Sequence, residues 1–141
     1  MSRKLLLTLL ALLAAPVSPA AAQEAAKGIH FELNKAETVN GTCRVTLVTR
    51  NDMASALKAF SVDLVVFDDA EGVAGYAAID IGALPAGKTR VRQYDVAKGD
   101  CGGFSRFLVN DVRACEGASG EVQDCLGALR LSSRTKIDLV L

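Results

Sequence analysis

Apolar and polar residues alternate with a period of two along most of the chain after residue 28, and this pattern constrains the fold more than any other feature. In the last stretch, Leu129–Leu141, the odd positions are apolar or small, and the even positions from Arg130 to Asp138 are charged or polar. Successive side chains of a β-strand point to opposite faces, so the alternation predicts one half-buried strand. We expect buried Leu129, Leu131, Ile137 and Leu139, and exposed Arg130, Arg134 and Lys136.

Six further segments show the same period, and the joints between them carry turn residues. The segments are IHFELNKAETV (29–39), CRVTLVTRN (43–51), FSVDLVVFD (60–68), GVAGYAAIDI (72–81), TRVRQYDV (89–96) and SRFLVNDVRAC (105–115). Asn40-Gly41 is a two-residue hairpin signal, and LPAGKT (84–89) contains a proline and a glycine that interrupt strands. About seven strands in about 115 residues predict a β-sandwich. The segment NDMASALKAF (51–60) fits either a short helical turn or a crossover loop.

The N-terminus has the parts of a secretory signal peptide. Arg3 and Lys4 precede an apolar run, Leu5–Ala15, and small residues at Ala20 and Ala22 form an A-x-A cleavage site. The run is about 11 residues long, well short of the roughly 20 that a membrane-spanning helix needs. We therefore expect a cleaved signal peptide over residues 1–22, no membrane span after cleavage, and a periplasmic or secreted protein. The leucine-rich run favours the general secretory route over the twin-arginine route.

Cleavage there would leave one domain and a nearly neutral chain. Residues 23–28, QEAAKG, read as a short linker before a single β-sandwich domain over residues 29–141. Without Arg3 and Lys4, the 16 basic residues of the full chain fall to 14, against 16 acidic residues. A charge near −2 gives no electrostatic reason to bind nucleic acid or an anionic membrane.

The four cysteines all lie in the exported part, and an even number in an oxidising compartment predicts two disulfides. Three pairings are possible. We favour Cys115–Cys125, because CEGASGEVQDC is a short polar loop that such a bridge would pin, and Cys43–Cys101 then follows by elimination. A metal site is the rival interpretation, but zinc-like CxxC spacing is missing and the single histidine is distant in sequence. We expect no bound metal and no cofactor.

The stretch VVFDDAEGVAG (65–75) clusters Asp68, Asp69 and Glu71 beside Gly72. A calcium loop of the EF-hand type begun at Asp68 would need an oxygen ligand, a glycine and a glutamate at positions where the chain has alanine, valine and isoleucine. A catalytic carboxylate pair would need a desolvating pocket, which neighbouring turn residues do not imply. Aspartate, glutamate and glycine suit a tight turn, so we expect residues 68–72 to connect two strands of a β-hairpin.

The segment from residue 43 to residue 96 combines strand ends and turns in a particular order. These are Asn51 at the end of one strand, the aromatic-Asp pair Phe67-Asp68 at the end of the next, the turn glycine Gly72, and Leu84–Thr89 before the strand that follows. In these positions the segment resembles the FxLYD-type module of exported bacterial proteins. With NDVRACE and SSRTKI added, the whole chain after the leader is similar to small exported proteins of alphaproteobacteria. The resemblance implies an all-β fold, an immunoglobulin-like antiparallel β-sandwich of about seven strands, and brings no catalytic residues.

Enzyme signatures do not stand out in the sequence. No GxSxG, no HExxH and no phosphate-binding glycine loop occurs, and His30 lies at the start of the first predicted strand. The favoured hypothesis is a non-enzymatic interaction or accessory module of the bacterial envelope, whose partner is another envelope protein. The alternatives are a small-ligand or metal-ion binder and, less favoured, an enzyme. The candidate partner surface is the basic set Arg130, Arg134 and Lys136, which a solvated strand face or edge protection also explains.

Overall fold

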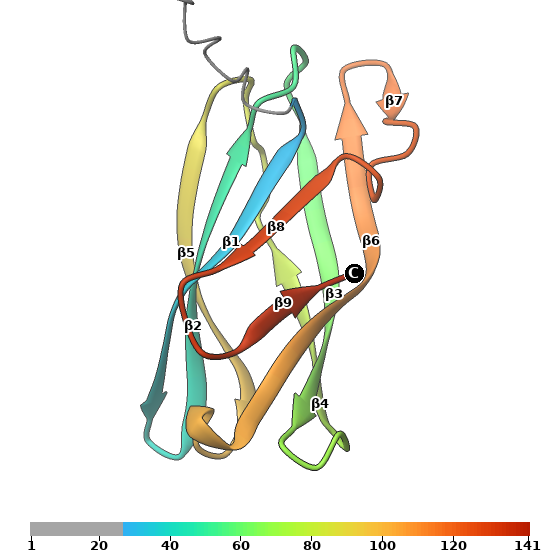
Figure 1. The fold of residues 1–141 in the computed structure, drawn as a ribbon. Helices are drawn as coiled ribbons and strands as arrows, with labels where there is room; N and C mark the ends of the chain where they lie inside the picture. The colour runs from blue at the N-terminus through green and yellow to red at the C-terminus, as the bar shows by residue number, and fades with distance from the viewer. Residues whose placement is uncertain (1–26) are drawn as a thin grey trace, which may run out of the picture.

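The computed structural model describes residues 27–141, which form two β-sheets packed face to face (Figure 1). This confirms the predicted β-sandwich. The predicted signal peptide and most of the predicted linker lie outside the described residues. The elements are β1 (Ile29–Val39), β2 (Thr42–Asn51), β3 (Ala59–Asp68), β4 (Val73–Asp80), β5 (Thr89–Lys98), the 3-10 turn η1 (Cys101–Gly103), β6 (Phe104–Gly117), β7 (Gly120–Glu121), β8 (Leu129–Ser133) and β9 (Asp138–Val140).

The first sheet has the order β5-β2-β1-β8, and the second has the order β4-β3-β6, with both β7 and β9 pairing with β6. Hairpins join β1 to β2, β3 to β4 and β6 to β7 within a sheet. The chain crosses between the sheets at all other connections between consecutive strands, including β4 to β5. Two of the pairs, β1 with β8 and β6 with β9, are parallel. The sheets are therefore mixed, whereas we expected an antiparallel sandwich.

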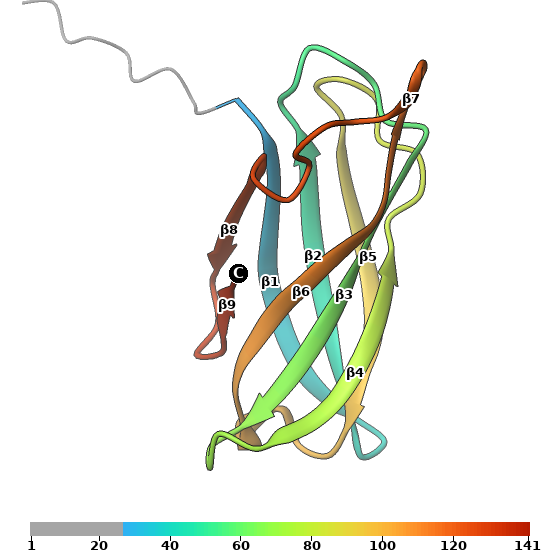
Figure 2. The ribbon, with the colours of Figure 1, turned by 90° about the vertical axis from the view of Figure 1, so that its right-hand side faces the viewer.

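The prediction of one continuous C-terminal strand is wrong. Residues 129–133 and 138–140 form two short strands, β8 and β9, which lie together at one side of the sandwich and pair with different sheets (Figure 2). Between them, Ser133 Oγ donates a hydrogen bond to the Ile137 carbonyl at 2.6 Å and accepts one from the Thr135 amide at 3.1 Å. Serine and threonine side chains that bond to nearby backbone compete with strand ladders, and here they form the turn.

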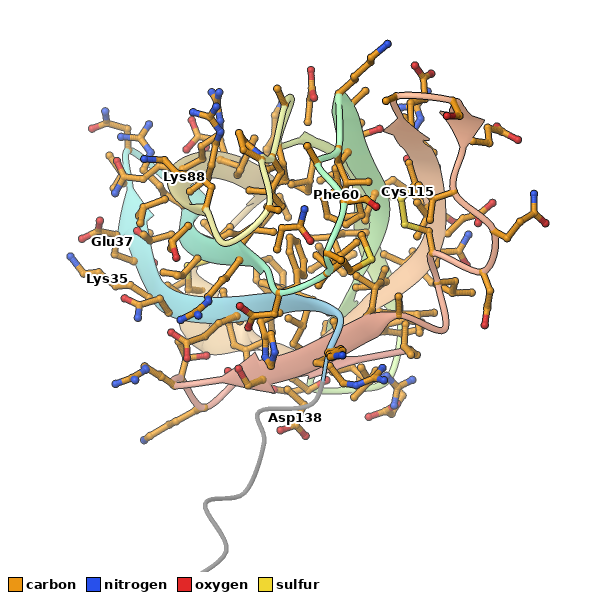
Figure 3. All side chains as sticks on the ribbon, turned by 90° about the horizontal axis from the view of Figure 1, so that it is seen from above. Lys35, Glu37, Phe60, Lys88, Cys115 and Asp138 are labelled. Atoms are coloured by element: carbon orange, nitrogen blue, oxygen red, sulfur yellow. A yellow bond between two sulfur atoms is a disulfide. The ribbon has the colours of Figure 1, made fainter. Side chains whose placement is uncertain are left out.

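The core lies between the inward faces of the two sheets. Phe31 and Phe60 meet edge to face across it, with ring centroids 6.5 Å apart, and Phe60 is seen in the interior in Figure 3. In the C-terminal part, Leu129, Ile137 and Leu139 are buried as expected. Leu131 is only half-buried, because β8 is an edge strand and the side chain packs against the core from its rim.

The segment between β2 and β3 is a crossover loop and forms no helix. Asn51, fully buried at the end of β2, holds this loop from inside. Its Nδ2 donates to the carbonyls of Ser55 and Leu84 at 2.8 and 3.0 Å, and its Oδ1 accepts from the Met53 amide at 2.9 Å. One side chain thus joins the β2–β3 loop to the loop between β4 and β5. Thr49, two residues earlier, is also fully buried, and its Oγ1 has no hydrogen-bond partner in residues 27–141.

Candidate functional site

Two disulfides form, in the predicted pairing. Cys43 of β2 bonds Cys101 of η1, and Cys115 of β6 bonds Cys125 in the loop after β7 (Figure 3 labels Cys115). Within the described residues no cysteine is free. The two bridges indicate an oxidising, extracytoplasmic environment. Across residues 27–141, no helix is long and apolar enough to span a membrane.

The acidic stretch is the tip of the β3–β4 hairpin, which confirms the predicted turn. Asp68 Oδ1 accepts hydrogen bonds from the amides of Ala70 and Gly72, at 2.9 and 2.8 Å, so this carboxylate shapes the turn itself. Glu71 has a positive φ of 64° and pairs with Arg106 of β6 at 2.6 Å. The guanidinium of Arg106 also lies 4.3 Å from the centre of the Phe67 ring. The described residues contain no cluster of three or more metal-ligating side chains.

The three basic residues chosen as a candidate partner surface lie on β8 and in the turn that follows it. Arg130 lies on β8 and donates to the carbonyls of Gly127 and Leu129, at 2.8 and 2.9 Å. Arg134 and Lys136 lie in the turn between β8 and β9, where Arg134 pairs with Glu32 of β1 at 3.1 Å. Lys136 is exposed. Arg130 and Arg134 thus both lie along β1, next to His30 and Glu32 respectively.

His30 sits on the outer face of β1, where its Nε2 lies 3.2 Å from Asp52 Oδ2. Arg50 of β2 holds the other oxygen of Asp52 at 2.6 Å. The histidine thus belongs to a surface group with a carboxylate and a guanidinium.

The outer face of the first sheet is covered by ion pairs. Arg44 of β2 and Asp95 of β5 bond through two contacts of 2.7 and 3.0 Å, and this arginine lowers the pKa of the Asp95 carboxyl. The pKa of Glu32 is also lowered, first by the hydrogen bond from Asn34 and then by Arg134. These ion pairs are exposed to solvent, and the exposed Val91 of β5 lies beside Val48 of β2 on the same face.

The outer face of the second sheet has a different character. Register places Tyr76 of β4 beside Val65 of β3, Val65 beside Leu108 of β6, and Leu108 beside Val140 of β9. These four residues, hereafter the apolar row, cross the whole sheet. Tyr76 is 77% exposed, whereas Val65 is 7% exposed although it points away from the core.

A shallow depression of about 330 Å³ adjoins the apolar row. Its lining includes Val65 and Tyr76 from the row, with Asp63, Asn110 and Arg113 as polar neighbours. The Asp63 carboxylate and the Arg113 guanidinium lie 3.5 Å apart. An apolar centre with a polar rim is the usual anatomy of a protein interface.

The sequence reasoning missed the apolar row. One signal was present, because Leu64, Val65 and Val66 are three consecutive apolar residues and depart from strict alternation. No protein-family model, curated protein or solved structure matches the chain. The resemblance to the FxLYD-type module therefore stays a prediction from sequence.

Proposed function

We propose that the protein is a non-enzymatic, exported β-sandwich module of the bacterial envelope that works by binding another envelope protein through the apolar row. The contrast between the two outer faces carries this proposal. One face carries several solvated ion pairs, and the other carries the highly exposed Tyr76 at the end of a row whose other members, Val65, Leu108 and Val140, are buried or half-buried.

Tyrosine is well suited to anchor such an interface. It contributes a large apolar area at a low cost in conformational entropy, and its hydroxyl can find a polar partner at the rim. Val65 lies beside it across the pairing of β3 with β4, and Leu108 lies beside Val65 on β6. The disulfides support the location of the module, since they indicate an extracytoplasmic environment.

Site-specific photo-crosslinking in the native host tests the proposal. Tyr76→p-benzoylphenylalanine should give a discrete adduct with one envelope protein under illumination, and Tyr76→Ser should compete poorly for that partner. Val91→p-benzoylphenylalanine is the matched control, because Val91 is 61% exposed at the edge of the opposite sheet.

The same preparation tests export. The intact mass of the purified protein should equal the mass of residues 23–141 less four hydrogens. Equal adducts at positions 76 and 91, or none at position 76, would contradict the proposed surface. A retained leader or free thiols would contradict the proposed location.

A further inference from the structure

Edge strands of the two sheets meet at both sides of the sandwich. At one side β4 and β5 meet, where the Tyr94 hydroxyl donates to the Asp80 carbonyl at 2.6 Å. At the other side β8 and β9 lie together (Figure 2). Among the described strands, unpaired stretches of edge remain on β1 after Leu33 and on β6.

β6 is long, and only its two ends are paired on the edge that faces away from β3. β9 pairs with residues 106–108, and β7 pairs with residues 116–117. Just beyond β7, the Val122 amide donates to the Cys115 carbonyl at 2.8 Å. In the described part of the chain no strand pairs with this edge from Val109 to Ala114, and Figure 1 shows β9 and β7 approaching β6 from below and above that stretch.

A cleft of about 230 Å³ lies along this unpaired edge. Residues 111–113 and Cys115 of β6 form one wall, and residues of the 121–126 segment form the other. The disulfide Cys115–Cys125 fixes the distance between the two walls at the upper end. The second wall carries Val122 and Leu126, the latter 39% exposed.

Edge protection alone does not explain this cleft. β6 has bulges against β3 at Asn110 and Arg113, and charged Asp111 is exposed, which are devices that discourage uncontrolled strand pairing. These devices account for the β6 wall only. They do not require an apolar wall, Val122 and Leu126, held opposite it by a disulfide.

The charged residues that line the cleft indicate what kind of ligand it would bind. Asp111, Glu121 and Asp124 line it, against a single guanidinium, Arg113, which already lies 3.5 Å from Asp63 on the outer face. A ligand that carries a basic residue is therefore favoured. The apolar wall favours apolar neighbours around that basic residue.

The ends of the cleft limit the length of the occupant. Six residues, Val109–Ala114, are unpaired, which corresponds to about 20 Å of extended chain. A second copy of this chain cannot fill the cleft with its own β6, because that strand would continue past the cleft into the space that β9 or β7 occupies. The cleft suits a short segment that enters and leaves, such as a chain end or an exposed loop.

We infer that the cleft beside Val109–Ala114 binds a short extended segment of another polypeptide, with a lysine or arginine among apolar residues, as an added strand on β6. Main-chain hydrogen bonds to β6 would supply affinity, and the acidic and apolar walls would supply selectivity. This site is separate from the apolar row and extends the proposed function to a second mode of binding, so it stands or falls on its own test.

Selection from a phage-displayed library of random heptapeptides against the purified, disulfide-bonded protein tests this inference. Enriched sequences should carry lysine or arginine with β-branched or apolar neighbours and lack central proline, which cannot donate to a strand ladder. On binding of a synthetic selected peptide, hydrogen exchange of β6 amides within residues 109–114 should slow at least tenfold.

Charge and wall variants identify the site. Glu121→Lys and Leu126→Lys should each weaken the peptide at least tenfold, whereas Asp69→Lys, the same charge change at the far hairpin tip, should leave its affinity within twofold. Tyr76→Ser should also leave it unchanged, which separates this site from the apolar row. No enrichment, enrichment of acidic peptides, or protection of amides elsewhere would overturn the inference.

Discussion

Replacing Asn51 by alanine should destabilise the protein strongly although no ligand or partner is involved. The side chain is fully buried and makes three hydrogen bonds, to Ser55, Leu84 and Met53. Loss of a typical neutral hydrogen bond costs about 1 kcal/mol, so Asn51→Ala should lower the free energy of unfolding by about 3 kcal/mol. For about 115 ordered residues, 1 kcal/mol corresponds to about 4 °C in Tm, and the expected decrease in Tm is therefore about 12 °C.

Thermal unfolding followed by far-UV circular dichroism measures this decrease, since the chain has no tryptophan to report by fluorescence. Asn51→Asp should lose at least as much stability at pH 7, because a carboxylate would face two carbonyl oxygens that the amide now serves as donor. Asn110→Ala, at an exposed asparagine of β6, is the control and should change Tm little. A Tm of Asn51→Ala within about 2 °C of wild type would refute the view that this side chain holds the two loops together.

Three further outcomes are expected. Thr49→Val should raise stability, by up to about 1 kcal/mol in urea denaturation, because it removes a buried hydroxyl without a partner in residues 27–141; a clear loss would show that the hydroxyl is satisfied. Leu129→Ala should cost about 2–5 kcal/mol and Leu131→Ala about half as much, since only the first is fully in the core; equal costs would contradict the described packing of β8. The pKa of Glu32 is lower in the folded protein than its ordinary value of 4.5, so its ionised form stabilises the fold above that pH, and this stability is lost as the pH falls through the folded pKa. Glu32→Gln should therefore flatten the decline in the free energy of unfolding below pH 4.5. An unchanged decline would rule out this carboxyl as its source.

Strands β1 to β6 could be predicted from the sequence to within two residues at each end. Alternation is a local signal, and each of these strands has one face on the core and one in water, so the period alone marks its extent. The break between β8 and β9 could not be found in this way. The odd-numbered residues face inward both before and after the turn between Ser133 and Ile137, so the alternation continues across it unbroken.

The apolar row could not be predicted from the sequence, because it depends on the register in which distant strands pair. Val65 and Leu108 are 43 positions apart and become neighbours only through the pairing of β3 with β6, which contains bulges that no local pattern announces. The three arginine and lysine residues near the C-terminus are close in sequence and looked like one surface. The strand ends after Ser133, so Arg130 lies on β8 and the other two lie in the turn, where Arg134 pairs with Glu32 of β1.

The parallel pairing of β1 with β8 has a consequence for the time course of folding. Ile29 pairs with Leu129, so β1 cannot pair with β8 until a segment about a hundred residues later in the chain is present. Long-range pairings of this kind slow folding, because the entropy of closing a long loop must be lost before the contacts form. During synthesis, this edge of β1 would stay open until residues 129–133 have been made. The sandwich could therefore not be completed before that point, which suits translocation in the unfolded state along the proposed export route.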